Sequence, residues 1–457
     1  MKFLKSEFGR YISLSILGML GSSGTILADT FFVSNRLGSE GLAALNLAIS
    51  VFGLINGVGM MFGIGGATRY AIFRTQGNQK KADETFTLAF ACALTAGILF
   101  WLIGQLFSGE IVRLLGAEDS IYPMCRTYLY TVLCFAPCFI LNHLFMAFIR
   151  NDGSPRLAMC TMMTGSLANI VLDYLFIYPF GMGIFGAALA TGLSPVIGLG
   201  VSSLHRIYGR NRFHFTRVIP SLREIRATAG IGLSAFFNEF SSSIVLVVFN
   251  LLILRAAGTV GVAAYGIVAN LALVVLAVFT GISQGIQPLI SRAHGRCDRQ
   301  EIASLTRKSL LLAAGIGTVV FGIAFLGASG LVSWFNPAGD TALQSIAESG
   351  LRLYFVGFLF VGCNIVTASR FSATERAGAA FFLSFFRGFV GIIALAAVFS
   401  ALWGMTGIWL AFPAAELLTL GIGWKLSQGQ TESQNRYSGP EHSGMSLTAA
   451  PLRKAAD

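Results

Sequence analysis

Charged residues are scarce in this sequence. They make up 12% of the 457 residues, about half the roughly 25% that is usual in soluble proteins, while 54% are hydrophobic and the mean hydropathy is +0.71. A water-soluble protein of this length needs a charged surface that so few side chains cannot cover. The composition therefore excludes a soluble enzyme, a secreted disulfide scaffold and a disordered chain, and it predicts a polytopic membrane protein.

Motifs for catalysis and for cofactor binding are also missing from the sequence. Cys134 and Cys138 lie one helical turn apart, but no histidine or second cysteine pair completes a zinc-ligand set. We find no HExxH motif, no phosphate-binding Walker loop and no Ser/His/Asp set. The sequence thus predicts that the chain is not an enzyme and has no cofactor or resident metal, and that any transport is driven by an ion gradient rather than by ATP.

Long apolar runs dominate what is present. About 20 apolar residues in a helix cross a hydrocarbon core of about 30 Å. Twelve such runs occur, at 10–33, 43–68, 85–108, 122–148, 157–178, 184–205, 227–254, 263–290, 309–332, 350–369, 380–401 and 405–425. The sequence therefore predicts twelve transmembrane helices.

The distribution of lysine and arginine predicts the orientation. With the amino terminus in the cytoplasm, 27 of the 32 basic residues fall in inner segments, including Arg150 and Arg387. The outer side holds Arg36, Arg113, Arg126, Arg255 and Arg352. Because positive residues are retained on the cytoplasmic side, this asymmetry predicts a cell (inner) membrane protein with both termini cytoplasmic. The net charge of +11 is then explained by membrane insertion, and we expect no nucleic-acid partner.

Two stretches repeat at a nearly constant offset. Residues 37–49 (LGSEGLAALNLAI) align with residues 257–269 (AGTVGVAAYGIVA), which places Gly38 on Gly258. Farther along, Gly183 aligns with Gly404 and Gly186 with Gly407. Each repeat unit contains six spans, which is an even number, so both units begin on the same side of the membrane. The two units are therefore related by an axis along the membrane normal. The predicted fold is therefore an all-α membrane protein with twelve helices in two six-helix lobes.

The predicted domains follow from this repeat. They are an amino-terminal lobe (1–205), a basic cytoplasmic linker (206–226), a carboxy-terminal lobe (227–426) and a polar, disordered cytoplasmic tail (427–457). A substrate path between the two lobes, opening alternately to either side, is the architecture expected of a transporter.

Four carboxylates lie well inside the predicted spans: Asp29, Asp173, Glu239 and Glu416. A charge at mid-bilayer costs about 3 kcal/mol or more, so such residues usually face a cavity or a partner. No lysine in the spans offers a salt bridge. We therefore expect protons, metal cations or a cationic substrate to be their counter-charges.

Depth separates these acids into two groups. Asp29 and Asp173 lie roughly 7 and 9 Å from the outer ends of their spans, and Thr191 lies at a similar depth. Asn169 shares a helix face with Asp173, and the Ala187 carbonyl lies one turn above Thr191. These oxygen ligands suit Na⁺, and two close carboxylates can equally share a proton. The sequence predicts a cation site in the amino-terminal lobe.

The second lobe lacks this cluster, because Asp29, Asn169, Asp173 and Thr191 correspond to Phe249, Val390, Ala394 and Phe412. Glu239 and Glu416 instead lie nearer the bilayer middle, where we expect a central cavity for a cationic substrate. Methionines such as Met61 are candidates for the lining of an adaptable pocket.

Several stretches resemble the multidrug and toxic compound extrusion (MATE) antiporters. They are residues 26–48, RNDGSPR at 150–156, NIVLDYLFIYPFGMGIFGAALAT at 169–191 and GISQGIQPLISRAHG at 281–295. The resemblance implies a cation site at Asp29, Asn169, Asp173 and Thr191, and export of amphiphilic, often cationic compounds in exchange for Na⁺ or H⁺. Such export is one route to antibiotic resistance.

Two departures from that family are visible. The first span has glycines where some members have a bending proline, and span 10 contains no acid, so that Asn364 is its polar candidate for the substrate cavity. The remaining alternatives are a lipid-linked oligosaccharide flippase or another polytopic transporter of the same superfamily, and a channel. The expected partners are small amphiphilic substrates, a monovalent cation and the lipid bilayer, with the chain acting as a monomer.

Overall fold

The computed structural model describes residues 6–336 and 339–437, which are almost entirely helical. The helices are α2 (Glu7–Thr75), α3 (Gln79–Leu114), α4 (Tyr122–Cys134), α5 (Ala136–Asn151), α6 (Pro155–Ile177), α7 (Gly183–Ile207), α8 (Leu222–Gly295), α9 (Arg299–Leu326), α10 (Ala328–Phe335), α11 (Thr341–Tyr354), α12 (Phe358–Ala373), α13 (Ala377–Phe385) and α14 (Gly391–Tyr437). A 3₁₀ turn (Phe355–Gly357) joins α11 to α12, and a π-helical turn (Phe386–Val390) joins α13 to α14.

The three longest helices each consist of two helices that meet at a glycine. Gly38 in α2, Gly258 in α8 and Gly404 in α14 have φ of 66°, 64° and 56°. An unbroken helix of 74 residues, the length of α8, would be about 110 Å long, far more than a bilayer needs. Among the described residues nine helices are long and apolar enough to cross a membrane, with α2 already divided at Gly38, and α4 with α5, bent by 48°, make a tenth. Dividing α8 at Gly258 and the α13–α14 segment at Gly404 adds two, which gives the twelve predicted spans.

The backbone supports the repeat inferred from the sequence. Gly38 and Gly258, which the alignment pairs, share a conformation that only glycine adopts readily, with ψ of −154° and −158°. The second aligned pair, Gly183 and Gly404, also shares a positive φ, of 57° and 56°. Equivalent helix joints in the two halves therefore have the same geometry.

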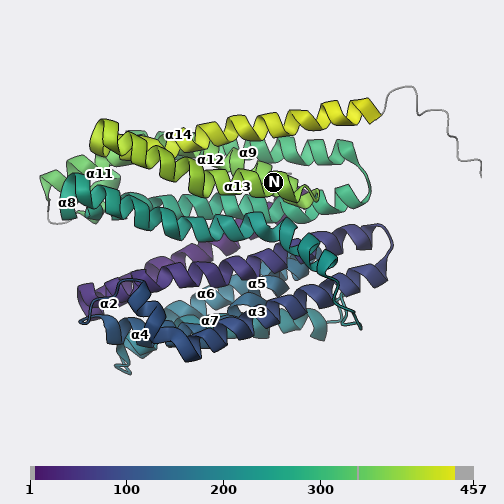
Figure 1. Ribbon diagram of the computed structural model, residues 1–457, viewed down its shortest axis with the longest axis horizontal. Coiled ribbons are helices and arrows are strands. Elements are labelled where there is room, and N and C mark those ends of the chain that lie inside the picture. The colour runs from purple at the N-terminus through teal and green to yellow at the C-terminus, as the bar shows by residue number, and fades with distance from the viewer. Residues whose placement is uncertain (1–5, 337–338, 438–457) are drawn as a thin grey trace, which may run out of the picture.

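The two halves of the chain form two lobes that lie side by side (Figure 1). Helices α2 to α7, drawn purple to blue, form one lobe, and α8 to α14, drawn teal to yellow, form the other. We define the basic end as the end where the chain turns at 76–78, 152–154 and 296–298. Near it α2 and α8 cross so closely that only glycine fits at the contact. A β-carbon on Gly232 would collide with the Met61 carbonyl, and one on Gly65 with the Thr228 carbonyl.

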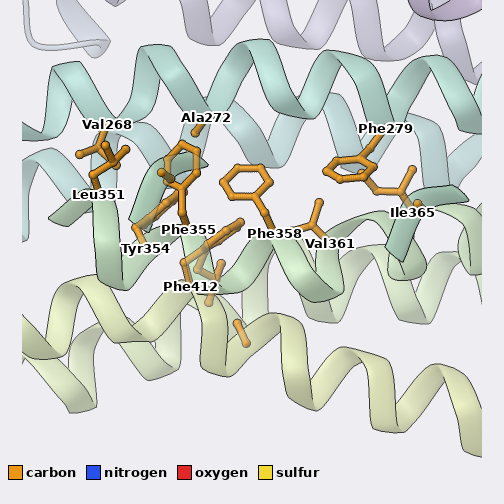
Figure 2. Packing of buried hydrophobic residues seen from close by; sticks show 14 of the residues in the cluster. Val268, Ala272, Phe279, Leu351, Tyr354, Phe355, Phe358, Val361, Ile365 and Phe412 are labelled. Carbon is orange, nitrogen blue, oxygen red and sulfur yellow. The ribbon is translucent and has the colours of Figure 1, made fainter. Parts of the chain in front are cut away.

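The carboxy-terminal lobe is organised around an aromatic core (Figure 2). The rings of Tyr354 and Phe412 stack with centroids 4.2 Å apart and planes 7° apart. Phe358 packs on both, and Phe249 stacks on Tyr265 at 5.6 Å. Each buried aromatic side chain removes about 150–250 Å² of largely apolar surface from contact with solvent, so these rings contribute strongly to the packing of the lobe.

The predicted linker is fixed to the amino-terminal lobe. Residues 208–221, which we name the interlobe strap, run without regular structure from α7 to α8. Phe213 of the strap is buried against Phe86, with ring centroids 4.6 Å apart, and stacks on His205 at 5.8 Å. The backbone N–H of Arg212 donates to Asp152 Oδ2 at 3.0 Å. The strap is therefore part of the folded lobe.

Asp152 is the polar centre of this contact. Its fully buried carboxylate accepts from the Tyr70 hydroxyl at 2.9 Å, pairs with His205 Nε2 at 2.8 Å and forms an ion pair with Arg74. Removing one partner of a buried charge pair leaves the other uncompensated, which is strongly destabilising.

We expect Asp152→Ala to lower the free energy of unfolding by on the order of 3 kcal/mol. The apparent Tm of the purified protein should fall by several degrees as a result. The strap should also become a substrate for trypsin at Arg210 or Arg212. The exposed Asp119, changed to alanine, is the matched control and should leave both readouts unchanged. An unaltered Tm together with unaltered proteolysis in the Asp152 variant would contradict this role.

One predicted boundary is wrong in part. The sequence predicts a disordered tail from residue 427, but α14 continues to Tyr437, so residues 427–437 are helical. Polar residues do not end a helix by themselves, and no proline follows Pro413 until Pro440. The rest of the predicted tail, residues 438–457, lies outside the described residues.

Candidate cation site and central cavity

The structure brings together the side chains predicted to form the cation site. Asp29 comes from α2, Asn169 and Asp173 from one face of α6, and Thr191 from α7. Asn169 and Asp173 have 0% exposed surface and Thr191 has 7%. Four helix positions separated by up to 162 residues therefore converge inside the amino-terminal lobe.

The Asn169 amide bridges the two carboxylates. Oriented with its nitrogen toward them, the amide donates to Asp29 Oδ1 at 3.0 Å and to Asp173 Oδ2 at 3.3 Å, while its oxygen accepts from the Thr191 backbone N–H at 3.2 Å. The contacts to one amide nitrogen place the two carboxylates close to each other. Such close carboxylates cannot both remain ionised without a compensating cation or proton.

One oxygen of this cluster has no partner. Asp173 Oδ1 is buried and accepts no hydrogen bond from any described residue. A buried carboxylate oxygen without a donor costs free energy, and a proton or a cation on that oxygen would offset this cost. The Ala187 carbonyl accepts from Thr191 Oγ1 at 3.0 Å, which places a further oxygen beside the cluster. The donor set consists of hard oxygens, which suit Na⁺ as well as a proton.

Tyr128 on α4 is not among the residues predicted from the sequence. Its side chain is 5% exposed and lies near Thr191, Asp29 and Asp173. Its depth is a partial signal, because Tyr128 lies six residues from the start of α4, roughly 9 Å into the span and close to the depths of Asp29 and Asp173, but depth does not show which way the side chain faces.

The corresponding place in the other lobe is filled by aromatic rings. Phe249 and Phe412, the repeat partners of Asp29 and Thr191, are 1% and 5% exposed and belong to the aromatic core. Both pack against Tyr354, with ring centroids 6.3 and 4.2 Å away. The described part of this lobe thus replaces the oxygen cluster with apolar packing.

A cavity of about 70 Å³, lined by polar and apolar side chains, lies between the lobes. Glu239 and Asn364, both predicted for the substrate cavity, line it together with Met60, Arg150 and Arg387. Glu416 and Met61 are not among the lining residues. Pockets that enclose drug-sized ligands measure about 300–1,000 Å³, so the lobes must separate before an amphiphile can enter.

The expectation that Glu416 lacks a basic partner is wrong. Arg387 Nε donates to Glu416 Oε1 at 2.6 Å, and Asn364 Nδ2 donates to Glu416 Oε2 at 2.7 Å. Arg387, which the charge distribution places with the inner basic residues, lies in the π-helical turn within the predicted span 380–401. Because the two residues are 29 positions apart on different helices, only the packing of those helices shows the pair.

Polar contacts join the two lobes near the basic end. Arg69 of α2 pairs with Glu224 of α8 at 2.5 Å, and Gln287 of α8 donates to Thr68 at 2.5 Å. Asn151 donates to Gln287 at 3.1 Å, and Arg292 pairs with Glu7 at 2.7 Å. These contacts, with the close crossing at Gly65 and Gly232, hold the basic end closed in this structure.

Comparison with known proteins agrees with this architecture. The multidrug export protein MepA of Staphylococcus saprophyticus is 27% identical over 424 residues, covering 90% of this chain and 92% of that protein. MepA of Staphylococcus aureus (strain MRSA252) is 26% identical, covering 87% of this chain and 89% of that protein.

A solved structure shares the fold. The outward-facing conformation of a multidrug resistance MATE family transporter of the MOP superfamily superposes with a TM-score of 0.86 at 23% identity, covering 95% of this chain and 98% of that one. The MatE family matches residues 15–175 and 234–418. Because that match covers most of the chain, and because the helices are those of a multi-pass membrane protein, the chain belongs to the MatE family.

Proposed function

We propose that this chain is a secondary active exporter of chemically diverse amphiphiles, often cationic, which it exchanges for Na⁺ or H⁺. The observation that carries the proposal is the pair of carboxylates bridged by Asn169, the half-buried Asp29 and the buried Asp173, with Asp173 Oδ1 lacking a partner among the described residues. Membership in the MatE family and the names of its relatives, multidrug export proteins, support the same activity.

The candidate cation site and the substrate cavity lie apart, but helix α2 contributes side chains to both. Asp29 is on α2, and the same helix contributes Met60 and Ile64 to the cavity beyond the break at Gly38. A cation that binds the carboxylates shifts α2 relative to α6, and this movement changes the cavity wall. Exchange then requires only that the cation has different affinities for the two lobe arrangements.

The proposed orientation places the basic end in the cytoplasm, with both termini there and the chain in the cell membrane. Closure of that end then makes this structure a state whose cavity is barred from the cytoplasm. Both lobes are supplied by one chain, at 1–205 and 227–426 with the linker 206–226 between them. We therefore propose that a monomer is the functional unit.

Inside-out membrane vesicles test the proposal. We expect vesicles that contain the protein to accumulate a fluorescent cationic amphiphile when the lumen is loaded with Na⁺ or is made acidic, with one of the two gradients supporting uptake. Collapse of that gradient by an ionophore should release the dye. Uptake that depends on ATP, or that ignores both gradients, would contradict an ion-coupled exchanger.

A further inference from the structure

We propose that the amino-terminal lobe binds one phospholipid with an anionic, hydroxyl-bearing headgroup in a groove between α5, α7 and the interlobe strap. This groove, which we name the strap groove, has a volume of about 640 Å³ and lies at the basic end. It shares no lining residue with the central cavity among the residues described. The inference goes beyond the proposed export function and does not depend on it.

The long walls of the strap groove are apolar. Leu141 and Ile149 line it from α5, and Leu199 and Ile207 line it from α7. Eight residues separate the two members of each pair, so the groove runs about 12 Å along both helices. Ile207 is 70% exposed, and both helices belong to membrane spans. Because an apolar groove of this kind favours apolar contents over water, an acyl chain of the surrounding bilayer is its natural occupant.

The mouth of the strap groove is positively charged. Arg206 lines it in the last turn of α7, and its guanidinium forms no hydrogen bond or ion pair with another described residue. From Arg206 to Arg217 the chain carries four arginines and no acid. Asp83 of α3 lies beside the strap, but its carboxylate already accepts from the His214 backbone N–H at 3.0 Å. Basic side chains at the end of a span attract anionic lipid headgroups.

Two buried acceptors in the wall of the strap groove lack donors. His205 is 2% exposed, its Nε2 pairs with Asp152 at 2.8 Å, and its Nδ1 has no partner among the described residues. Because the Asp152 carboxylate can only accept, Nε2 carries the proton, and Nδ1 of the neutral ring is an acceptor. Asn211 donates to the Phe213 carbonyl at 2.7 Å, which leaves its Oδ1 without a donor. Both residues line the groove, and two hydroxyl groups would satisfy them.

A glycerol phosphate headgroup matches these features together. Its phosphate can pair with the Arg206 guanidinium, and its two hydroxyls can donate to His205 Nδ1 and Asn211 Oδ1. A choline headgroup has no hydrogen-bond donor. An ethanolamine headgroup has donors, but its ammonium would be repelled by the arginines around the mouth. We therefore expect phosphatidylglycerol to bind better than either zwitterionic lipid.

Native mass spectrometry of the purified protein tests the proposal. Delipidated protein in detergent micelles receives equal amounts of dioleoyl phosphatidylglycerol, phosphatidylethanolamine and phosphatidylcholine, which share the same acyl chains. We expect one phosphatidylglycerol molecule to be retained about fivefold more often than either of the other lipids. Soluble glycerol phosphate in excess should not displace it, because the apolar walls of the groove hold the acyl chain.

Two variants separate the charge from the groove. Arg206→Gln removes the guanidinium, and we expect retention of phosphatidylglycerol to fall about fivefold, to the level of the zwitterionic lipids. Ser203, which is exposed and lines the groove, is changed to tryptophan to fill it, and retention of phosphatidylglycerol should again fall at least about fivefold. The matched controls are Arg299→Gln and Leu167→Trp, at exposed positions outside the groove, and they should retain the lipid as the wild-type chain does. Membrane insertion and Tm are checked first.

Equal retention of the three lipids by the wild-type chain, or unchanged retention in either test variant, would overturn the proposal. Displacement by soluble glycerol phosphate would show that the mouth binds a free anion, and displacement by a fluorescent cationic amphiphile would make the groove a substrate site. Either result would also overturn it. Because lipid retention is measured without any ion gradient, a failure of the proposed export function would appear only in the vesicle experiment.

Discussion

Replacement of Asp173 by asparagine should abolish gradient-driven export and leave the protein folded in the membrane. The substitution removes the charge that a proton or Na⁺ would neutralise, so the site no longer distinguishes the two states of the exchange. Asparagine has nearly the same shape, and Asp173 Oδ1 has no donor to lose. We therefore expect dye efflux to fall to the level of cells without the transporter, while the Tm is unchanged or rises slightly.

The control for this experiment is Asp119→Asn at an exposed turn, which should export normally. Asp29→Asn should match the Asp173 variant, because both acids share the Asn169 amide. Drug resistance at the wild-type level in cells that produce the Asp173 variant would show that this cluster is not the coupling site.

Replacement of Gly232 by valine should prevent the lobes from closing at the basic end. The β-carbon of valine would meet the backbone carbonyl of Met61, and a backbone group cannot rotate aside as a side chain can. Alternating access requires this closure, so we expect export to fall at least about tenfold, with normal amounts of protein in the membrane.

Spin labels on exposed positions of the two lobes, Lys80 and Arg299, measure the closure directly. The exposed cysteines Cys160 and Cys297 are first replaced by serine. The distance between the labels should lengthen in the Gly232→Val variant. Gly230→Val is the matched control, because its β-carbon would meet nothing nearer than Ala377 Cβ at 3.7 Å. Identical distances and export rates in the two variants would refute the packing argument.

Family membership confirms that the chain is a transporter and not an enzyme, as the missing catalytic motifs indicate. The sequence also predicts the twelve spans and the paired glycines correctly. Both depend on local properties, because the apolar length of a span and the left-handed conformation of Gly38 or Gly258 are dictated by residues next to each other in the chain.

The candidate cation site is predictable for a related reason. A helix rises 1.5 Å per residue, so the distances of Asp29, Asp173 and Thr191 from the ends of their spans are enough to set them at one depth. Depth does not say which face of a helix meets which neighbour. Tyr128 is missed for that reason, although it lies at the same depth and near Thr191.

The sequence by itself determined the twelve apolar spans and the similar depth of Asp29, Asp173 and Thr191 in one lobe, because hydrophobic length and helical rise act along the chain. Only the tertiary structure decided that Glu416 is paired with Arg387 and that the strap is bound by Asp152. Those contacts join residues 29 and 60 positions apart, and the choice of partner depends on how helices rotate and pack against one another.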